Sequence, residues 1–280
     1  MRKQSVDASG PGPAASPADQ ASVEDADLRD SLAGLSRLVL PNGEQGLEAM
    51  LGSVAEFAVQ AIPGANGASL TLLDDDRPDR PDTVVATAEI VRQVDAIQYG
   101  IGEGPCIAAV AQGRTVRSGS LSGDPAWPRF GPRAGRLGVH SALSLPLLGP
   151  HGGLGALNIY AGAKHAFDAR AARLGEMFSV PAAVTVQNAR ELAHARQLAA
   201  QLEQALISRS VIDQALGILM SRSGCGSDEA FEKLRTLSQR EHRKLSEVAR
   251  LLVDESVRRA RARSGGTQDR GASAGSQTPR

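Results

Sequence analysis

The segment SALSLPLLGPHGGLGALNIY, residues 141–160, determines the fold of the larger part of the chain. It contains two apolar runs, at residues 141–147 and 154–160, separated by the sequence GPHGG at residues 149–153. Two short apolar runs that flank a glycine-rich turn are typical of an antiparallel β-hairpin. The segment therefore predicts an antiparallel sheet near the centre of the chain.

Further strands and helices are predicted on both sides of this hairpin. Apolar residues recur at intervals of three and four from Leu47 to Ala61, which indicates an amphipathic helix that ends at Pro63. The combination predicts an α+β domain over residues 41–190, with an antiparallel sheet flanked by helices. The remaining strands are expected at residues 68–73, 83–87 and 114–117, and further helices near residues 105–111 and 127–137.

A long helical segment begins at Asp168, and Pro181 is expected to kink or interrupt it. Its later part, residues 191–206, has small and apolar residues three or four positions apart, a seam that suits pairing with a second helix. This pattern predicts a connecting coiled-coil helix and a homodimer formed through it. The residues of the seam are Leu192, Ala195, Ala199, Leu202, Ala205 or Leu206, and then Ile212.

Three helical segments at the C-terminal end predict a small all-α bundle over residues 207–257. The first carries the sequence ISRSVIDQALGILM at residues 207–220, where Gly217 is expected to allow close approach of another backbone, that of a packed helix in the favoured interpretation or of RNA as the alternative. The second is expected to begin with Ser227 as its N-cap. Its apolar face is predicted to comprise Ala230, Phe231, Leu234 and Leu237, and that of the third segment Leu245, Val248, Ala249, Leu252 and Val253.

The composition excludes several classes of protein. Lys and Arg (31) balance Asp and Glu (31), and aromatic residues make up 3%, so neither a globally basic protein nor aromatic stacking platforms for nucleic acid are expected. No apolar run reaches the roughly 18–20 residues of a membrane span, and a cytoplasmic location is expected. The two cysteines and the isolated histidines predict neither a disulfide framework nor a metal site.

Both ends of the chain are poor in apolar residues. Residues 1–40 are predicted to be mainly disordered, although the spacing of Leu28, Leu32 and Leu35 allows a short helix. Residues 258–280 are predicted to form a flexible tail.

The segment at 207–220 resembles the opening helix of the ANTAR domain, the RNA-binding module of antitermination regulators. DEAF at 228–231, LRTLSQ at 234–239, and Lys244-Leu245 with Val248-Ala249 are similar to the rest of that domain in order and spacing. The chain departs from the family pattern at His242, where the family more often has Asn. His also adopts a left-handed backbone readily, so the turn at this position is expected to persist. The resemblance implies binding of tandem stem-loops in nascent transcripts, with control of transcription termination or of translation.

Candidate RNA contacts lie on the predicted polar faces of this bundle. Helical phase places Arg209 outward and Gln214 near the boundary, where they could contact phosphates or base edges. The alternative is a solvated face with an Arg209–Asp213 ion pair, and helix capping for the residues near the second turn. Eight basic and eight acidic residues between 209 and 255 leave only a small basic surface. The full set of candidates is Arg209, Gln214, Arg235, Ser238, Gln239, Arg243 and Lys244.

The sequence GEGPC at residues 102–106, the hairpin, and the helix from Asp168 together resemble the GAF domain, a sensory α+β module. The resemblance implies a small-molecule ligand between the sheet and the loops on one face, and no cofactor is identified. Cys106, Tyr99, Trp127 and Phe130 are candidate pocket residues, with ordinary core packing as the alternative. Cys106 is either a redox-sensitive thiolate at a helix start or a buried, inert thiol.

The favoured interpretation is a sensory regulator without catalytic residues. A DNA-binding regulator is the first alternative, because a three-helix bundle is compatible with a helix-turn-helix. A GAF-type methionine sulfoxide reductase is the second alternative, but only Cys106 lies in that domain.

Overall fold

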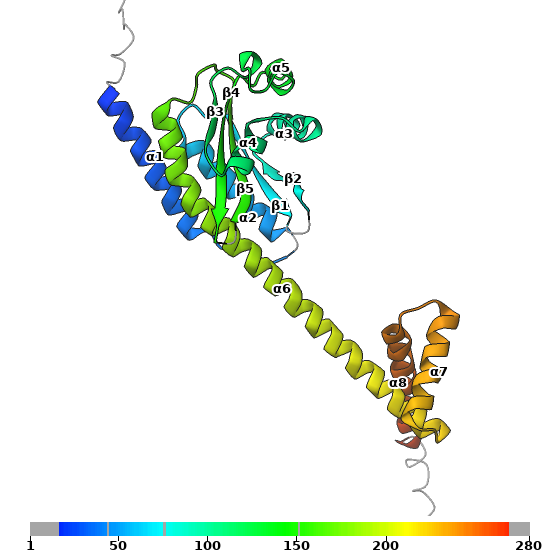
Figure 1. Cartoon of the computed structure of the whole chain (residues 1–280). Helices are drawn as coiled ribbons and strands as arrows, with labels where there is room; N and C mark the ends of the chain where they lie inside the picture. Colours follow the sequence, from blue (N-terminus) through cyan, green and yellow to red (C-terminus); the bar gives the residue numbers. More distant parts are fainter. Residues whose placement is uncertain (1–16, 44, 75–76, 151, 269–280) are drawn as a thin grey trace, which may run out of the picture. The chain divides into compact units, whose positions relative to one another are not determined.

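The computed structural model describes residues 17–43, 45–74, 77–150 and 152–268. The chain divides into two compact units, Met1–His194 and Ala195–Arg280. Helix α6 (Ala169–Ser223) contributes residues to both units (Figure 1). None of the helices in the described ranges combines the length and the apolar character needed to cross a membrane.

The first unit contains a five-stranded sheet in the order β2-β1-β5-β4-β3, in which every neighbouring pair is antiparallel. Strands β4 and β5 form the predicted hairpin, with Leu145 opposite Leu157, so this prediction is confirmed. The strands are β1 (Gly67–Asp74), β2 (Arg77–Ala86), β3 (Val116–Ser118), β4 (Ser141–Gly149) and β5 (Gly152–Ala161).

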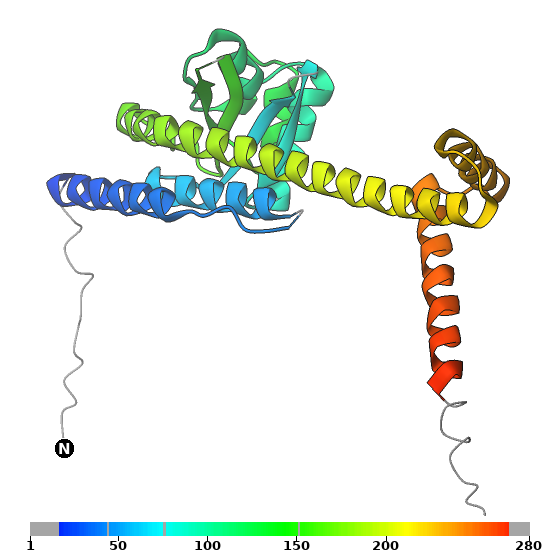
Figure 2. The same cartoon turned by 90° about the horizontal axis from the view of Figure 1, so that it is seen from below.

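One face of the sheet is apolar and packs on helices α1 (Pro17–Arg37), α2 (Gly46–Ala61) and the beginning of α6 (Figure 2). Successive residues of a strand point to opposite faces, so every second residue of β1, β4 and β5 lies on this side. The sheet residues of this cluster are Ala68, Leu70, Leu72, Leu143, Leu145, Leu147, Leu157, Ile159 and Ala161, with Val85 from β2.

The opposite face of the sheet is also buried, but its central positions are polar. Ser69, Thr71, Ser144 and Asn158 alternate with the apolar residues and are all fully buried. This face is covered by α3 (Glu89–Ile101), α4 (Pro105–Gln112) and α5 (Phe130–Arg136). Both faces of the sheet are thus covered by helices, as expected for the predicted α+β class.

Helix α1 contradicts the predicted disorder of much of residues 1–40. Leu28 and Leu35 belong to the first core cluster, and Arg170 on α6 holds the helix through Glu24 at 2.6 Å. The spacing of the leucines predicted only a short helix. A long helix forms because α2 and α6 supply a surface on which α1 packs. Residues 1–16 lie outside the described part of the chain.

Helix α6 continues through Pro181 without the expected interruption. Proline removes one backbone donor from a helix, and the carbonyl four residues earlier loses its partner. Met177, Val180 and Val184 are exposed by 60%, 68% and 55%, so this side of the helix faces solvent. Water can satisfy the freed carbonyl there, which is the physical reason that the helix persists.

The second unit is the expected three-helix bundle of the C-terminal part of α6, α7 (Ser227–Glu241) and α8 (Leu245–Gln268). Its core is formed by Ala215, Leu234, Val248 and Ala249 with a ring of half-buried apolar residues.

Three details of the bundle differ from the predictions. Gly226 rather than Ser227 is the N-cap of α7, and Phe231 is 40% exposed instead of lying on the core face. Helix α8 extends well past residue 258 into the predicted tail, and Glu255 pairs with Arg258 and Arg259 one turn on, which adds a few tenths of a kcal/mol to this part of the helix. Residues 269–280 lie outside the described part.

Candidate nucleic-acid interface and buried polar cluster

The two candidate contacts on α6, Arg209 and Gln214, are both exposed but lie on different sides of the helix. Five residues at 100° each place them about 140° apart around the axis. In the part of the chain that is described, no carboxylate lies within 4.0 Å of Arg209, so the alternative Arg209–Asp213 ion pair is absent. The guanidinium of Arg209 is therefore free to meet a ligand, but not together with Gln214.

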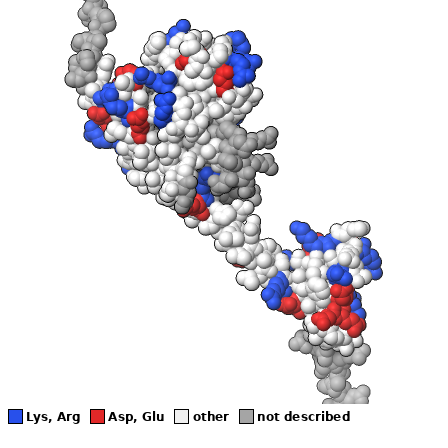
Figure 3. Space-filling model, in the orientation of Figure 1, with Lys and Arg blue, Asp and Glu red and all other residues white. Residues whose placement is uncertain are grey.

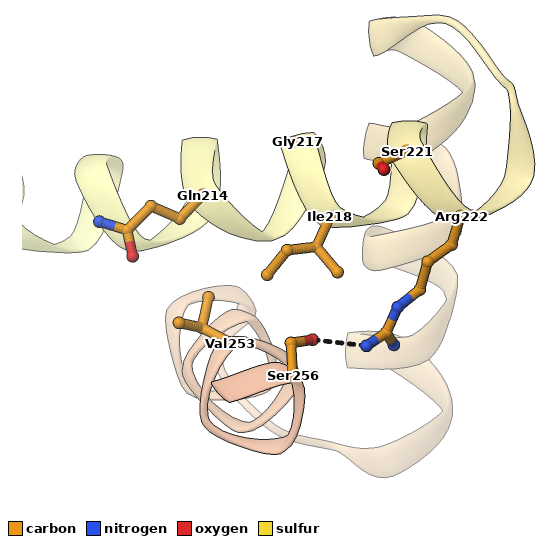
Figure 4. A pocket seen from close by; sticks show the side chains of 7 residues that line it. All are labelled: Gln214, Gly217, Ile218, Ser221, Arg222, Val253 and Ser256. Atoms are coloured by element: carbon orange, nitrogen blue, oxygen red, sulfur yellow. Dashed lines mark hydrogen bonds between the residues drawn. The ribbon is translucent and has the colours of Figure 1, made fainter. Parts of the chain in front are cut away.

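Gln214 lies instead at one end of a groove between α6 and α8 (Figure 4). A Cβ atom added at Gly217 would meet nothing within 4 Å, so the expected close approach of a helix to Gly217 is wrong. The sequence pattern did not single out the other polar members of the groove, although residues 214, 217, 218 and 221 share one helical face. We call this the α6–α8 groove; it has a volume of about 480 Å³ and is lined by Gln214, Gly217, Ile218, Ser221, Arg222, Val253 and Ser256.

The turn between α7 and α8 carries four further candidate RNA contacts, and hydrogen bonds within the turn hold its conformation. His242 has a left-handed backbone (φ 51°), as the sequence predicted, and its N–H donates to the carbonyl of Gln239. The hydroxyl of Ser238 donates to the carbonyl of Arg243 at 2.6 Å. The proton of Ser238 is thus used within the turn, which leaves Gln239, Arg243 and Lys244 as its exposed donors.

Charges of both signs are interspersed over the visible face of the bundle (Figure 3). Arg235 pairs with Glu232 at 2.7 Å, and Arg243 with Glu247 at 3.5 Å. Exposed pairs of this kind are weak and can be exchanged for a phosphate. Among the described residues of the bundle, the cations without a carboxylate partner within 4.0 Å are Arg209, Arg222, Lys244, Arg250 and Arg261.

The first unit contains a fully buried polar cluster between the sheet and α3. The hydroxyl of Tyr160 donates to Asp95 Oδ1 at 2.5 Å. The Nε2 group of Gln98 donates to the same oxygen at 3.1 Å and to the Tyr160 oxygen at 2.9 Å. Burial, and then the charge of Asp95, raise the pKa of Tyr160 well above its usual value. The tyrosine is consequently a fixed hydrogen-bond donor to the carboxylate.

Cys106 lies beside this cluster and is fully buried. Its backbone N–H donates to Gln98 Oε1 at 3.1 Å, and its Sγ lies 3.7 Å from the hydroxyl of Tyr99, which also bonds to Thr71. Burial raises the pKa of the thiol to about 11, and the charge of Asp95 adds to the effect. The alternative of an exposed thiolate is therefore wrong, and Cys106 is a buried, protonated thiol at neutral pH.

The GEGPC sequence has a structural role that the sequence did not reveal. Gly104 has a φ of 154°, and a Cβ there would lie 2.3 Å from the side-chain oxygen of Gln98. Glu103 accepts hydrogen bonds from the backbone N–H of Phe130 and Arg129 and pairs with the Arg129 side chain at 2.8 Å. These bonds lower the pKa of Glu103. The motif therefore joins α3 to α4 and holds the beginning of α5.

Trp127 and Phe130 are buried, together with Tyr160, in a separate apolar cluster that α3 and α5 form with the sheet. The four candidate pocket residues thus lie on the same covered face of the sheet, Tyr99 and Cys106 beside the polar cluster and Trp127 and Phe130 in the apolar one. Asn158, which the sequence pattern did not identify, donates to the hydroxyls of Ser69 and Thr71 at 3.3 and 3.2 Å. Its Oδ1 atom is buried and has no donor among the described residues. Within the same ranges, His, Cys, Asp and Glu form no group of three that could hold a metal ion.

Comparison with known proteins divides the chain in the same way. A model described as a GAF domain matches residues 44–187, and a model described as an ANTAR domain matches residues 200–253. A search of curated proteins finds no match.

Solved structures show similarity to the first unit at low identity. The GAF domain of a phosphoenolpyruvate-protein phosphotransferase from Coxiella burnetii is 24% identical, with 64% of this chain and 98% of that chain covered and a TM-score of 0.44. A free methionine-R-sulfoxide reductase from Neisseria meningitidis, in complex with its substrate, is 18% identical, with 64% and 96% covered and a TM-score of 0.47.

Proposed function

Because the chain belongs to the GAF domain family and carries an ANTAR domain after it, we propose that it is a sensory regulator that binds RNA stem-loops through its C-terminal bundle. GAF and ANTAR domains are regulatory rather than catalytic modules. The target would be tandem stem-loops in nascent transcripts, met in the cytoplasm. The outcome would be antitermination of transcription or control of translation.

The observation that carries this proposal is the match of residues 200–253 to the ANTAR domain, on a bundle with unpaired cations. Arg209 and Lys244 are exposed and have no carboxylate within 4.0 Å in the described part of the chain. Arg235 and Arg243 are held only by exposed ion pairs. A near-neutral bundle with a few free cations suits a structured RNA loop, which is recognised by shape and by base contacts more than by total charge.

An apolar seam on α6 supports a homodimer. Leu198, Leu202 and Leu206 are exposed by 48%, 57% and 69%, and Leu192 by 45%. The stretch of α6 that carries them is largely free of charge on the face seen in Figure 3. A row of exposed leucines on a helix is typical of a surface that a second helix covers. A dimer would present two bundles to two stem-loops.

The input to the regulator would be received on the covered polar face of the sheet. Asn158 Oδ1 and Ser144 Oγ are buried and lack partners among the described residues. Buried acceptors without donors are rare, and a bound small molecule or water would satisfy them. A ligand that engages this face would alter the packing of α3 and α4, and we propose that this change controls RNA binding.

The test compares RNA and DNA as ligands of the full chain. A tandem stem-loop RNA, the same RNA with its loops closed into duplex, and a double-stranded DNA of equal length are titrated at one stated salt concentration. The proposal expects at least about tenfold tighter binding of the tandem stem-loops. Preference for the DNA would overturn it in favour of a DNA-binding regulator.

A further inference from the structure

The α6–α8 groove has the dimensions of a small-molecule site. Its volume of about 480 Å³ lies in the range of about 300–1,000 Å³ that is usual for such sites, although the groove is open to solvent rather than enclosed. Figure 4 shows Ile218 and Val253 pointing into the space between the helices, with Gln214 at one end and Arg222 at the other. The groove lies wholly within the second unit.

Gly217 lines the groove from α6 and is exposed to solvent. A glycine inside a helix costs about 1 kcal/mol relative to alanine, so its presence calls for a reason. Neither packing nor backbone conformation provides one, because a Cβ would meet nothing within 4 Å and φ is not positive. The missing side chain does leave the α6 backbone uncovered beside Ile218, where a flat group can approach it from solvent.

Arg222 is held in place at the mouth of the groove. Its Nη2 group donates to Ser256 Oγ at 2.8 Å, and the hydroxyl of Ser256 donates in turn to the carbonyl of Leu252 at 2.7 Å. In the described residues no carboxylate lies within 4.0 Å of this guanidinium, and no Asp or Glu lines the groove. A guanidinium that uses one of its five N–H donors and has no counter-charge is suited to a phosphate.

The polar groups of the groove fit a nucleobase better than an aliphatic ligand. Gln214 offers both a donor and an acceptor, the combination that pairs with the edge of adenine. Ser221 adds a hydroxyl at the rim. Proteins that read RNA loops typically take up unstacked bases between side chains and hydrogen-bond their edges.

We infer that the α6–α8 groove binds one unpaired base of an RNA loop, with the base between Ile218 and Val253 and its phosphate on Arg222. This inference rests on the proposed function and names the site within the bundle that reads the loop. It assigns a specific role to Arg222, which lies outside the set of contacts that the sequence suggested, and to Gly217, where the sequence left approach by RNA open as an alternative.

The experiment is a double-mutant cycle that combines substitutions in the groove with changes to single loop bases and compares the RNA affinities. Each unpaired position of a tandem stem-loop RNA is replaced in turn by an abasic nucleotide, and binding to the full chain is measured by fluorescence anisotropy. Gly217→Leu places a bulky side chain at the groove, and Gly217→Ala adds only a Cβ, which meets nothing in the free protein but takes up space that the base would use. Arg222→Ala is compared with Arg250→Ala, which removes an unpaired cation outside the groove. Circular dichroism checks that each variant folds.

The wild type is expected to lose about tenfold or more in affinity at one abasic position. With intact RNA, Gly217→Leu should lose a similar factor in affinity, and the abasic substitution should then cost it nothing further; Gly217→Ala should lose more than about twofold but less than Gly217→Leu. Arg222→Ala should weaken binding about tenfold and lower the salt slope by about one. Arg222→Ala should also reduce the loss of affinity that the abasic substitution causes, whereas Arg250→Ala should leave that loss unchanged.

Other results would overturn the inference in distinguishable ways. If the wild type binds the stem-loops and Gly217→Leu shows the same abasic costs, the groove is not the base site and the proposed function survives. If Gly217→Leu changes only the sedimentation of the protein, the groove is an interface between copies. If the wild type ignores stem-loop RNA, both the proposed function and the base site are wrong.

Discussion

The exposed leucines of α6 lead to a quantitative prediction for the homodimer. Leu202 and Leu206 are exposed by 57% and 69%; Leu202 lies on the predicted seam, and Leu206 is one of the two residues, with Ala205, predicted for its next position. Each Leu→Ala change removes three carbon groups, worth about 2.4 kcal/mol when burial is complete. Burial of only the exposed fractions gives about 1.5 kcal/mol for each leucine. A homodimer contains four of these side chains, so the double variant should lose about 6 kcal/mol of association free energy. This loss corresponds to an increase of roughly 10⁴-fold in the dissociation constant.

Sedimentation equilibrium over a wide range of protein concentration measures this constant directly. Leu251→Ala is the matched control, because it removes the same atoms from an exposed leucine (44%) on α8, away from the seam. The control should dissociate like the wild type, and both should keep their helical circular dichroism. The reasoning is refuted if the double variant dimerises as tightly as the control, or if the wild type is a monomer at every concentration.

Three further predictions concern the stability of the first unit, measured by urea unfolding. The pKa of Cys106 in the folded protein, about 11, lies above its usual 9.0, so the native state keeps a proton that the unfolded state loses. The free energy of unfolding should therefore fall by about 2–3 kcal/mol as the pH rises from about 9 to about 11. In Cys106→Ala this fall should be smaller, and an equal fall in both proteins would contradict the reasoning. Tyr160→Phe removes a donor to the buried Asp95 carboxylate and should cost about 1–3 kcal/mol, and a neutral result would mean that Asp95 is protonated or hydrated. Gly155→Ala places a Cβ 1.9 Å from a carbonyl oxygen of β1 and should lower the free energy of unfolding by about 3 kcal/mol or more. Gly153→Ala is the control, because its Cβ meets nothing within 4 Å. Equal stability of the two variants would show that β5 shifts freely.

Periodic local patterns were sufficient to predict most elements. The hairpin at residues 141–160, helix α2 and the bundle core were all predicted, because each is encoded by spacing within a short segment. Helix α3 was not predicted, since its buried face includes Asp95 and Gln98 as well as two valines. Polar residues on a buried face interrupt the apolar pattern on which such predictions rest.

The candidate sites could be predicted only in part. The sequence directed attention to Gln214 and Cys106, and the structure places each in a defined environment, one in a groove and the other in a buried polar cluster. It did not indicate Arg222 or Asn158. Arg222 donates a hydrogen bond to Ser256, which lies on α8, 34 positions further along the chain. The Oδ1 atom of Asn158 is buried without a partner because both faces of the sheet are covered.

The two domain types, the antiparallel hairpin and the left-handed turn at His242 could all be predicted from residue patterns, since each depends on residues that are close together in the chain. The protonated state of Cys106, the open space beside Gly217 and the order of α1 depend instead on packing in the folded chain. The burial of a thiol, the space beside a glycine and the docking of a weak helix are set by what packs against them. Those neighbours come from distant parts of the chain, and no local pattern encodes their positions.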